Sequence, residues 1–261
     1  GFAGNPDIDL STLLGGLNGI SNSAAALFGV LQNPNASPEQ KAAAQAQLGQ
    51  LSSSYLAYAT KVTLRPAGAA GEIEPEDGGQ YGIKLEYFAS ELNDTEFAVY
   101  HMNYHSRTPL ISGIASNFTT AAVQRDLAYL AQNAGNISKD NVYNLEAFSK
   151  GLIEYPEDIK LYGFSFNTTL DGTSVAGELA FRQDEPLQID DVEILYAGMP
   201  EQLANAGLRP ELEGISQVGR ADGNKVMPGE FAQGYILTDT SQAQVTATHL
   251  FGPLLFADNF T

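Results

Sequence analysis

The sequence predicts an all-β fold: a transmembrane barrel segment, built as an antiparallel meander of about five long strands with long α-helical extracellular loops. Residues 80–113 contain two runs of about ten residues in which apolar and polar side chains alternate around a short polar turn. Runs of this length can cross a bilayer as tilted strands. A soluble sandwich would bury the apolar side of such strands, whereas a barrel would turn it towards lipid.

The spacing of turns and inserts favours the barrel over the sandwich. A second long hairpin is expected over residues 154–189, because Asp171-Gly172 is a strong two-residue turn signal, and a final strand is expected over 235–250. The turns at 90–94 and 171–172 are short, whereas the inserts at 113–153 and 190–233 are long. Long inserts are unusual in a compact soluble domain. Short turns at one end and long loops at the other are typical of outer-membrane barrels.

The alternation assigns side chains to two faces. The face expected to contact lipid carries the aromatic residues Tyr81, Tyr87, Tyr100, Tyr104, Tyr162, Phe164, Phe166 and Phe181. The face expected to line the lumen carries the polar residues Lys84, Glu86, His101, Asn103, His105, Glu178 and Arg182. Along a strand, His101 and His105 lie about 13 Å apart, which is too far to share one metal ion. Ordinary polar lining and structural ion pairs are therefore favoured over metal binding or a translocation role.

The first 79 residues are expected to form a helical extracellular insert, and residues 80–261 the strands with their loops. One helix is expected over 8–32, and a second from the Ser37 capping signal to about residue 58. Two further short helices are expected within 113–153, over 119–135 and from 138 to about 151. The first helix carries apolar side chains that form either ordinary core or a pocket for capturing hydrophobic substrate: Leu13, Leu14, Leu17, Ile20, Leu27, Phe28 and Leu31.

Composition excludes several functions. The net charge is −18, with no basic cluster, so nucleic acid is not an expected partner. There is no cysteine, phosphate-binding loop, HExxH motif or nucleophile elbow, so neither an enzyme nor a cofactor is expected. Glu154, Glu157 and Asp158 form an acidic cluster that could bind Ca²⁺, although a hydrated rim is favoured. No apolar run is long enough for a transmembrane helix, and the opening residues lack a signal-peptide pattern.

Four stretches carry a family resemblance: DTEFAVYHMNYHSRTPLISG (94–113), IEYPEDIKLYGFSFNTTL (153–170), GELAFRQDEPLQI (177–189) and QVTATHLFGPLLFADNFT (244–261). They resemble a family of Gram-negative outer-membrane β-barrel proteins that is known as a domain of unknown function and typified by the alkane-uptake protein AupA. The resemblance implies a bacterial outer-membrane location with extracellular loops, contact with outer-membrane lipid and a periplasmic lipoprotein partner. Because members of the family are longer, the chain is expected to be an internal segment of a longer protein.

The resemblance also implies a function: an outer-membrane channel or uptake protein for hydrophobic small molecules such as alkanes, fatty acids or esters. Two alternatives stay open, a surface structural or adhesion protein anchored by a barrel, and a soluble lipid-binding domain. Loss of hydrocarbon uptake in a deletion strain would favour the channel or uptake protein over the structural or adhesion protein. Recovery from the aqueous phase without detergent would favour the soluble domain.

Overall fold

The computed structural model describes residues 9–66, 70–219, 224–249 and 251. Residues 8 and 250, the outermost positions of two predicted elements, lie outside these ranges. The chain folds as two compact units made of interleaved segments. The mixed unit combines Gly1–Ile73, Leu110–Glu154 and Gln188–Tyr235, and the sheet unit combines Glu74–Pro109, Tyr155–Leu187 and Ile236–Thr261.

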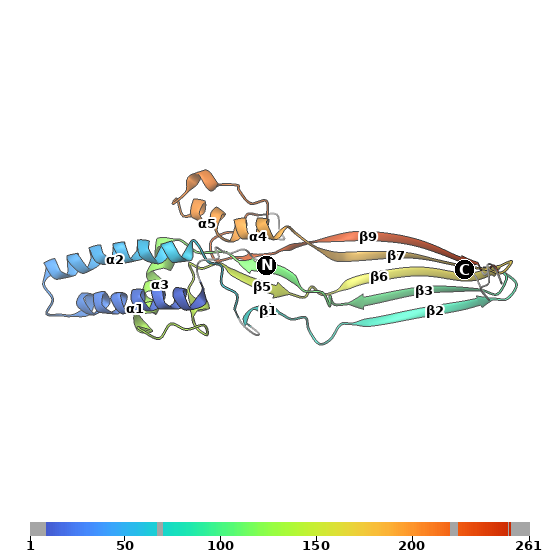
Figure 1. Ribbon diagram of the computed structural model, residues 1–261, viewed down its shortest axis with the longest axis horizontal. Coiled ribbons are helices and arrows are strands. Elements are labelled where there is room, and N and C mark those ends of the chain that lie inside the picture. The colour runs from blue at the N-terminus through green and yellow to red at the C-terminus, as the bar shows by residue number, and fades with distance from the viewer. Residues whose placement is uncertain (1–8, 67–69, 220–223, 250, 252–261) are drawn as a thin grey trace. The chain divides into compact units, whose positions relative to one another are not determined.

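Three helices dominate the mixed unit: α1 (Leu10–Gln32), α2 (Pro38–Ala59) and α3 (Thr120–Gln132). The Asp9 carboxylate accepts a hydrogen bond from the Thr12 N–H and so caps α1. The predicted capping box of α2 is present, with Ser37 and Gln40 bonded reciprocally. Helix α1 packs against both α2 and α3 (Figure 1).

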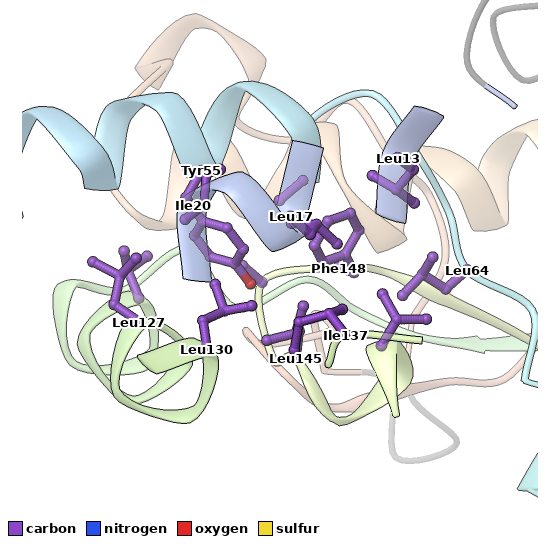
Figure 2. Close-up of a cluster of buried hydrophobic side chains, with 14 of the residues drawn as sticks. Leu13, Leu17, Ile20, Tyr55, Leu64, Leu127, Leu130, Ile137, Leu145 and Phe148 are labelled. Carbon is purple, nitrogen blue, oxygen red and sulfur yellow. The ribbon is translucent and has the colours of Figure 1, made fainter. Parts of the chain in front are cut away.

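The core of the mixed unit lies between these helices and the chain that follows α3. Figure 2 shows apolar side chains from α1, α2, α3 and the segment 137–148 converging on one cluster. The side chains labelled there are Leu13, Leu17, Ile20, Tyr55, Leu64, Leu127, Leu130, Ile137, Leu145 and Phe148. The Tyr55 and Phe148 rings meet edge to face, with their centroids 6.0 Å apart. The apolar spacing of α1 is therefore explained largely by its packing.

A four-stranded sheet completes the mixed unit, in the order β1 (Glu72–Ile73), β5 (Lys150–Glu154), β4 (Leu110–Ile114) and β8 (Phe231–Ala232). Between Gln188 and Tyr235 lie α4 (Asp191–Gly198), α5 (Pro200–Asn205) and the 3₁₀ turn Pro210–Leu212. The helix expected from residue 138 to about 151 is wrong. Only a 3₁₀ turn, Val142–Asn144, forms there, because the backbone at 149–151 bonds to Leu64 and continues into β5.

The sheet unit contains the five long strands that the sequence predicts: β2 (Tyr81–Ala89), β3 (Thr95–Tyr104), β6 (Ile159–Leu170), β7 (Thr173–Gln188) and β9 (Tyr235–His249). They lie side by side in the order β2-β3-β6-β7-β9 (Figure 1). Both predicted hairpins are confirmed. Asp171 and Gly172 have φ values of +47° and +78°, as a tight hairpin turn requires.

The prediction of an all-β barrel segment is wrong. The described strands form two separate sheets, of five and four strands, and neither closes into a barrel. With its helices, the fold is mixed α and β. The alternating pattern specified two-faced strands but not closure of the sheet, and the short strands β4 and β5 pair with each other rather than with the long strands.

The sequence was expected to contain no segment that could form a transmembrane helix. Helix α1 differs from this expectation, because by length and composition alone it could cross a membrane. Its most apolar window has a mean hydropathy of 1.2 and is 28% buried. A core helix of a soluble protein and a signal sequence meet the same criterion. Helix α1 therefore assigns no membrane location by itself.

Candidate functional site

The five-stranded sheet has two chemically different faces, and its register defines them. Directly paired residues on neighbouring antiparallel strands share a face. Val99 of β3 pairs with Leu85 of β2 and with Phe164 of β6, and Phe164 pairs in turn with Leu179 of β7. We call this side the apolar face; its members are Tyr81, Ile83, Leu85, Tyr87, Phe97, Val99, Tyr162, Phe164, Phe166, Leu179, Phe181, Ala243 and Val245.

Large side chains on the apolar face are exposed to an unusual degree. Tyr81 is 61% exposed, Leu85 is 64% exposed and Val245 is 71% exposed. Six of the face's residues also line an open hollow of about 680 Å³, with Val99 at one side and Ala243 at the other. Soluble monomers rarely expose large contiguous apolar patches, and those that they expose commonly mark an interaction site.

Aromatic contacts hold the rings of this face against one another. The His101 and Tyr162 rings are stacked with centroids 4.5 Å apart, and Tyr81 meets His101 edge to face at 5.7 Å. Phe97 stacks against Phe164 at 6.2 Å. The imidazole is thus packed among the rings.

The opposite side, which we call the polar face, carries several charged side chains that already have partners. Lys84 forms an ion pair with Glu86, and the Tyr100 hydroxyl donates a hydrogen bond to the Glu178 carboxylate. Arg182 lies 3.9 Å from Glu185. These contacts are local pairs within a strand or between close strands, and they satisfy the charges without a ligand.

The register corrects the assignment of four side chains in β3. Tyr100 and Tyr104 were expected beside Tyr81, and His101 and Asn103 beside Lys84. The structure instead pairs Tyr100 with Lys84, and Asn103 with Tyr81. The loop between Ala89 and Thr95 has five residues, so odd positions of β2 face the same way as odd positions of β3. Aromatic side chains on both phases of β3 concealed this register.

Two of the predicted lumen residues are instead buried at one end of the sheet. The Asn103 amide donates to the Gly79 carbonyl at 2.9 Å and to the Asp158 carboxylate at 2.8 Å. The His105 Nε2 lies 2.7 Å from the Gly78 carbonyl oxygen, and the Asp158 N–H donates to His105 Nδ1 at 3.2 Å. Asn103 and His105 therefore hold adjoining loops together.

The three acidic residues considered as Ca²⁺ ligands each have a separate partner. Glu154 accepts hydrogen bonds from Ser112 at 2.7 Å and from Tyr235 at 2.8 Å. Glu157 accepts one from the Glu76 N–H at 2.6 Å, and Asp158 is occupied by Asn103. Across the described ranges, no group of three potential metal ligands comes together.

The residues proposed for hydrophobic capture divide between two environments. Leu13, Leu17 and Ile20 are buried in the core of the mixed unit. Leu14 and Phe28 pack against that core while partly exposed, and Leu27 and Leu31 are also half-buried. Core packing explains the first three.

The sequence prediction missed the aliphatic part of the apolar face. Ile83, Leu85, Val99, Leu179 and Val245 lie among the predicted aromatic residues and are at least as exposed as several of them. Period-2 alternation was the signal that could have identified them, because they occupy the same phase as the correctly grouped rings.

The fold and this site define a class: a protein with two units, one an exposed, two-faced antiparallel sheet and the other a helical unit with its own core. The chain belongs to the family described as "Protein of unknown function (DUF1302)", whose family model matches residues 18–261. Comparison with curated proteins and comparison with solved structures each give no match.

Proposed function

We propose that this protein takes part in the uptake of hydrophobic compounds at a bacterial outer membrane, with the apolar face in contact with lipid hydrocarbon. The observation that carries the proposal is the exposure of Tyr81, Leu85, Leu179 and Val245 on one continuous face. Moving apolar surface out of water is favourable by about 25 cal/mol per Å². Contact with hydrocarbon would therefore stabilise the apolar face in its observed conformation, without rearrangement of its side chains.

The length and the second face of the sheet support the same location. The five strands contain 9, 10, 12, 16 and 15 residues, whereas a tilted strand needs about 9–11 residues to match the hydrocarbon core of a bilayer. The polar face keeps its charges in local pairs such as Lys84 with Glu86, and it can stay hydrated.

The substrate class rests on the family resemblance of residues 94–113, 153–170, 177–189 and 244–261. On the basis of this resemblance, we propose alkanes, fatty acids or esters as the transported compounds. The same resemblance is the basis for proposing extracellular loops and a periplasmic lipoprotein partner. Half-buried apolar residues of α1, such as Phe28 and Leu31, offer a surface on which such compounds could first be held.

Uptake in a deletion strain tests this function. The strain is complemented with the wild-type protein, with Leu179→Glu on the apolar face, or with Gln244→Glu on the polar face as the matched control. Uptake of labelled hexadecane is compared with uptake of labelled proline. We expect deletion and Leu179→Glu to lower hexadecane uptake several-fold and to leave proline uptake unchanged.

Two outcomes would contradict the proposal. Unchanged hexadecane uptake in the deletion strain, with the protein still in the membrane fraction, would indicate an anchored structural or adhesion protein. Full recovery of the protein in the aqueous phase without detergent would indicate a soluble lipid-binding domain.

A further inference from the structure

The polar face contains a hollow that the proposed uptake of hydrophobic compounds does not use. Its volume is about 530 Å³, and all five strands contribute lining residues. Ligand pockets typically measure about 300–1,000 Å³. Small side chains make the depression: Ala98 is paired directly with Ser165, and Asn167 with Ala176.

The neutral polar side chains around this hollow are uncommitted. Ser165, Asn167, Ser174, Gln244 and Thr246 all line it, and none of them donates or accepts a side-chain hydrogen bond with another described residue. Together they offer three hydroxyl groups and two amides. Each hydroxyl and each amide can both donate and accept hydrogen bonds.

Two of the three charged side chains that line the hollow already have partners. Lys84 is paired with Glu86, and Glu178 accepts the Tyr100 hydroxyl. With Glu96, the three charged lining residues carry one net negative charge. An anion would meet no free cation here, whereas a neutral ligand rich in hydroxyl groups would find several free donors and acceptors.

We propose that this polar hollow binds a neutral polyhydroxylated ligand of the size of a mono- or disaccharide. Such a ligand can form hydrogen bonds with the free hydroxyl and amide groups. Its binding does not require the Lys84–Glu86 ion pair or the Tyr100–Glu178 hydrogen bond to break. The site lies on the face opposite the proposed lipid contact, so it stands or falls independently of hydrocarbon uptake.

Calorimetric titration of the full chain with maltose tests the proposal, in a detergent whose head group is not a sugar. Thr246→Val removes one lining hydroxyl without changing the shape of the side chain. Thr248→Val is the matched control, because Thr248 lies two residues further along the same strand and outside the lining. Circular dichroism verifies that both variants fold, and Asn167→Leu provides a second lining variant.

We expect maltose to bind the wild type, Thr246→Val and Asn167→Leu to weaken binding about threefold to tenfold each, and Thr248→Val to leave it unchanged. Gluconate, an anionic polyol, should bind more weakly than glucose. Absence of maltose binding by the wild type would overturn the proposal. So would equal weakening by Thr246→Val and Thr248→Val, or a preference for gluconate.

Discussion

The ring of Tyr100 occupies the space that a side chain at Gly163 would need. The two residues are direct partners on β3 and β6, and a Cβ atom built on Gly163 would lie 1.9 Å from Cζ of Tyr100. Across the next strand pair, the Phe166 ring covers Gly177 in the same way, with a closest approach of 2.3 Å. Glycine at these positions lets a large ring lie against the sheet, and the Tyr100 ring thereby reaches Glu178.

Gly163→Ala should therefore destabilise the sheet unit. The added methyl group forces the Tyr100 ring away and breaks its hydrogen bond to Glu178, and overpacking of this kind costs about 1–3 kcal/mol. Gly151→Ala is the control, because nothing lies within 4 Å of a Cβ atom built there. Denaturant unfolding measures both free energies, and equal effects of the two substitutions would contradict the role of Tyr100.

A buried carboxylate ties the helices of the mixed unit to the following chain. Asp126 of α3 is 2% exposed, and it accepts hydrogen bonds from the Tyr55 hydroxyl at 2.6 Å and from the Glu146 and Ala147 N–H groups at 2.8 Å each. Tyr55→Phe removes the hydroxyl and leaves the carboxylate less satisfied.

Tyr55→Phe should lower the free energy of unfolding by about 1.5–3 kcal/mol, the usual contribution of a hydrogen bond to a charged group. Tyr143→Phe serves as the control, because the Tyr143 hydroxyl makes no hydrogen bond to a described residue. Its effect should stay within about 0.5 kcal/mol. A Tyr55→Phe variant as stable as Tyr143→Phe would show that the buried pair contributes nothing.

Two neighbouring carboxyl groups should respond to pH in opposite directions. Burial raises the pKa of Asp126, although its hydrogen bonds act the other way. The Arg125 guanidinium, bonded twice to Glu146 at 2.7 Å, lowers the pKa of Glu146. A raised folded-state pKa gives stability that is present below the unfolded value, about 3.9 for Asp, and is lost as pH rises through the folded value. A lowered folded-state pKa, as for Glu146, gives stability that is lost as pH falls through the folded-state pKa.

Urea unfolding between pH 3.5 and 6.5 tests these signs. The cost of Asp126→Asn should be greatest at the acidic end and should shrink as pH rises. The cost of Glu146→Gln should be small at the acidic end and should grow until this carboxyl is ionised in the unfolded chain as well as in the folded protein. If both costs changed in the same direction with pH, the assigned environments would be incorrect.

Local signals in the sequence were sufficient to predict the long strands. The Asp171-Gly172 turn fixed the second hairpin, and the alternation around residues 90–94 fixed the first. The faces of β3 were harder, because Tyr100 and His101 are both aromatic and only the loop length decides which of them shares a face with Leu85. Using the five-residue length of the 90–94 turn to derive the strand register would have placed Tyr100 beside Lys84.

The second sheet and the open architecture could not be predicted from such local signals. β1 and β8 contain two residues each, and the register of β5 depends on Leu64, which is 86 positions away from Lys150. Gly234 shows the same dependence on distant partners, because its backbone lies so close to the Ile111 carbonyl that a Cβ atom there would be 1.6 Å from the oxygen. Contacts of this kind are set by tertiary packing rather than by the period of the sequence.

The proposed lipid contact can be measured with single cysteines, since the natural sequence has none. Val245→Cys lies on the apolar face and Gln244→Cys, its neighbour, on the polar face; each carries a polarity-sensitive fluorophore in vesicles with brominated lipid. We expect a blue-shifted emission that the bromine quenches at position 245, and a water-like, unquenched emission at position 244. Equal, water-like emission at both positions would contradict lipid contact of the apolar face.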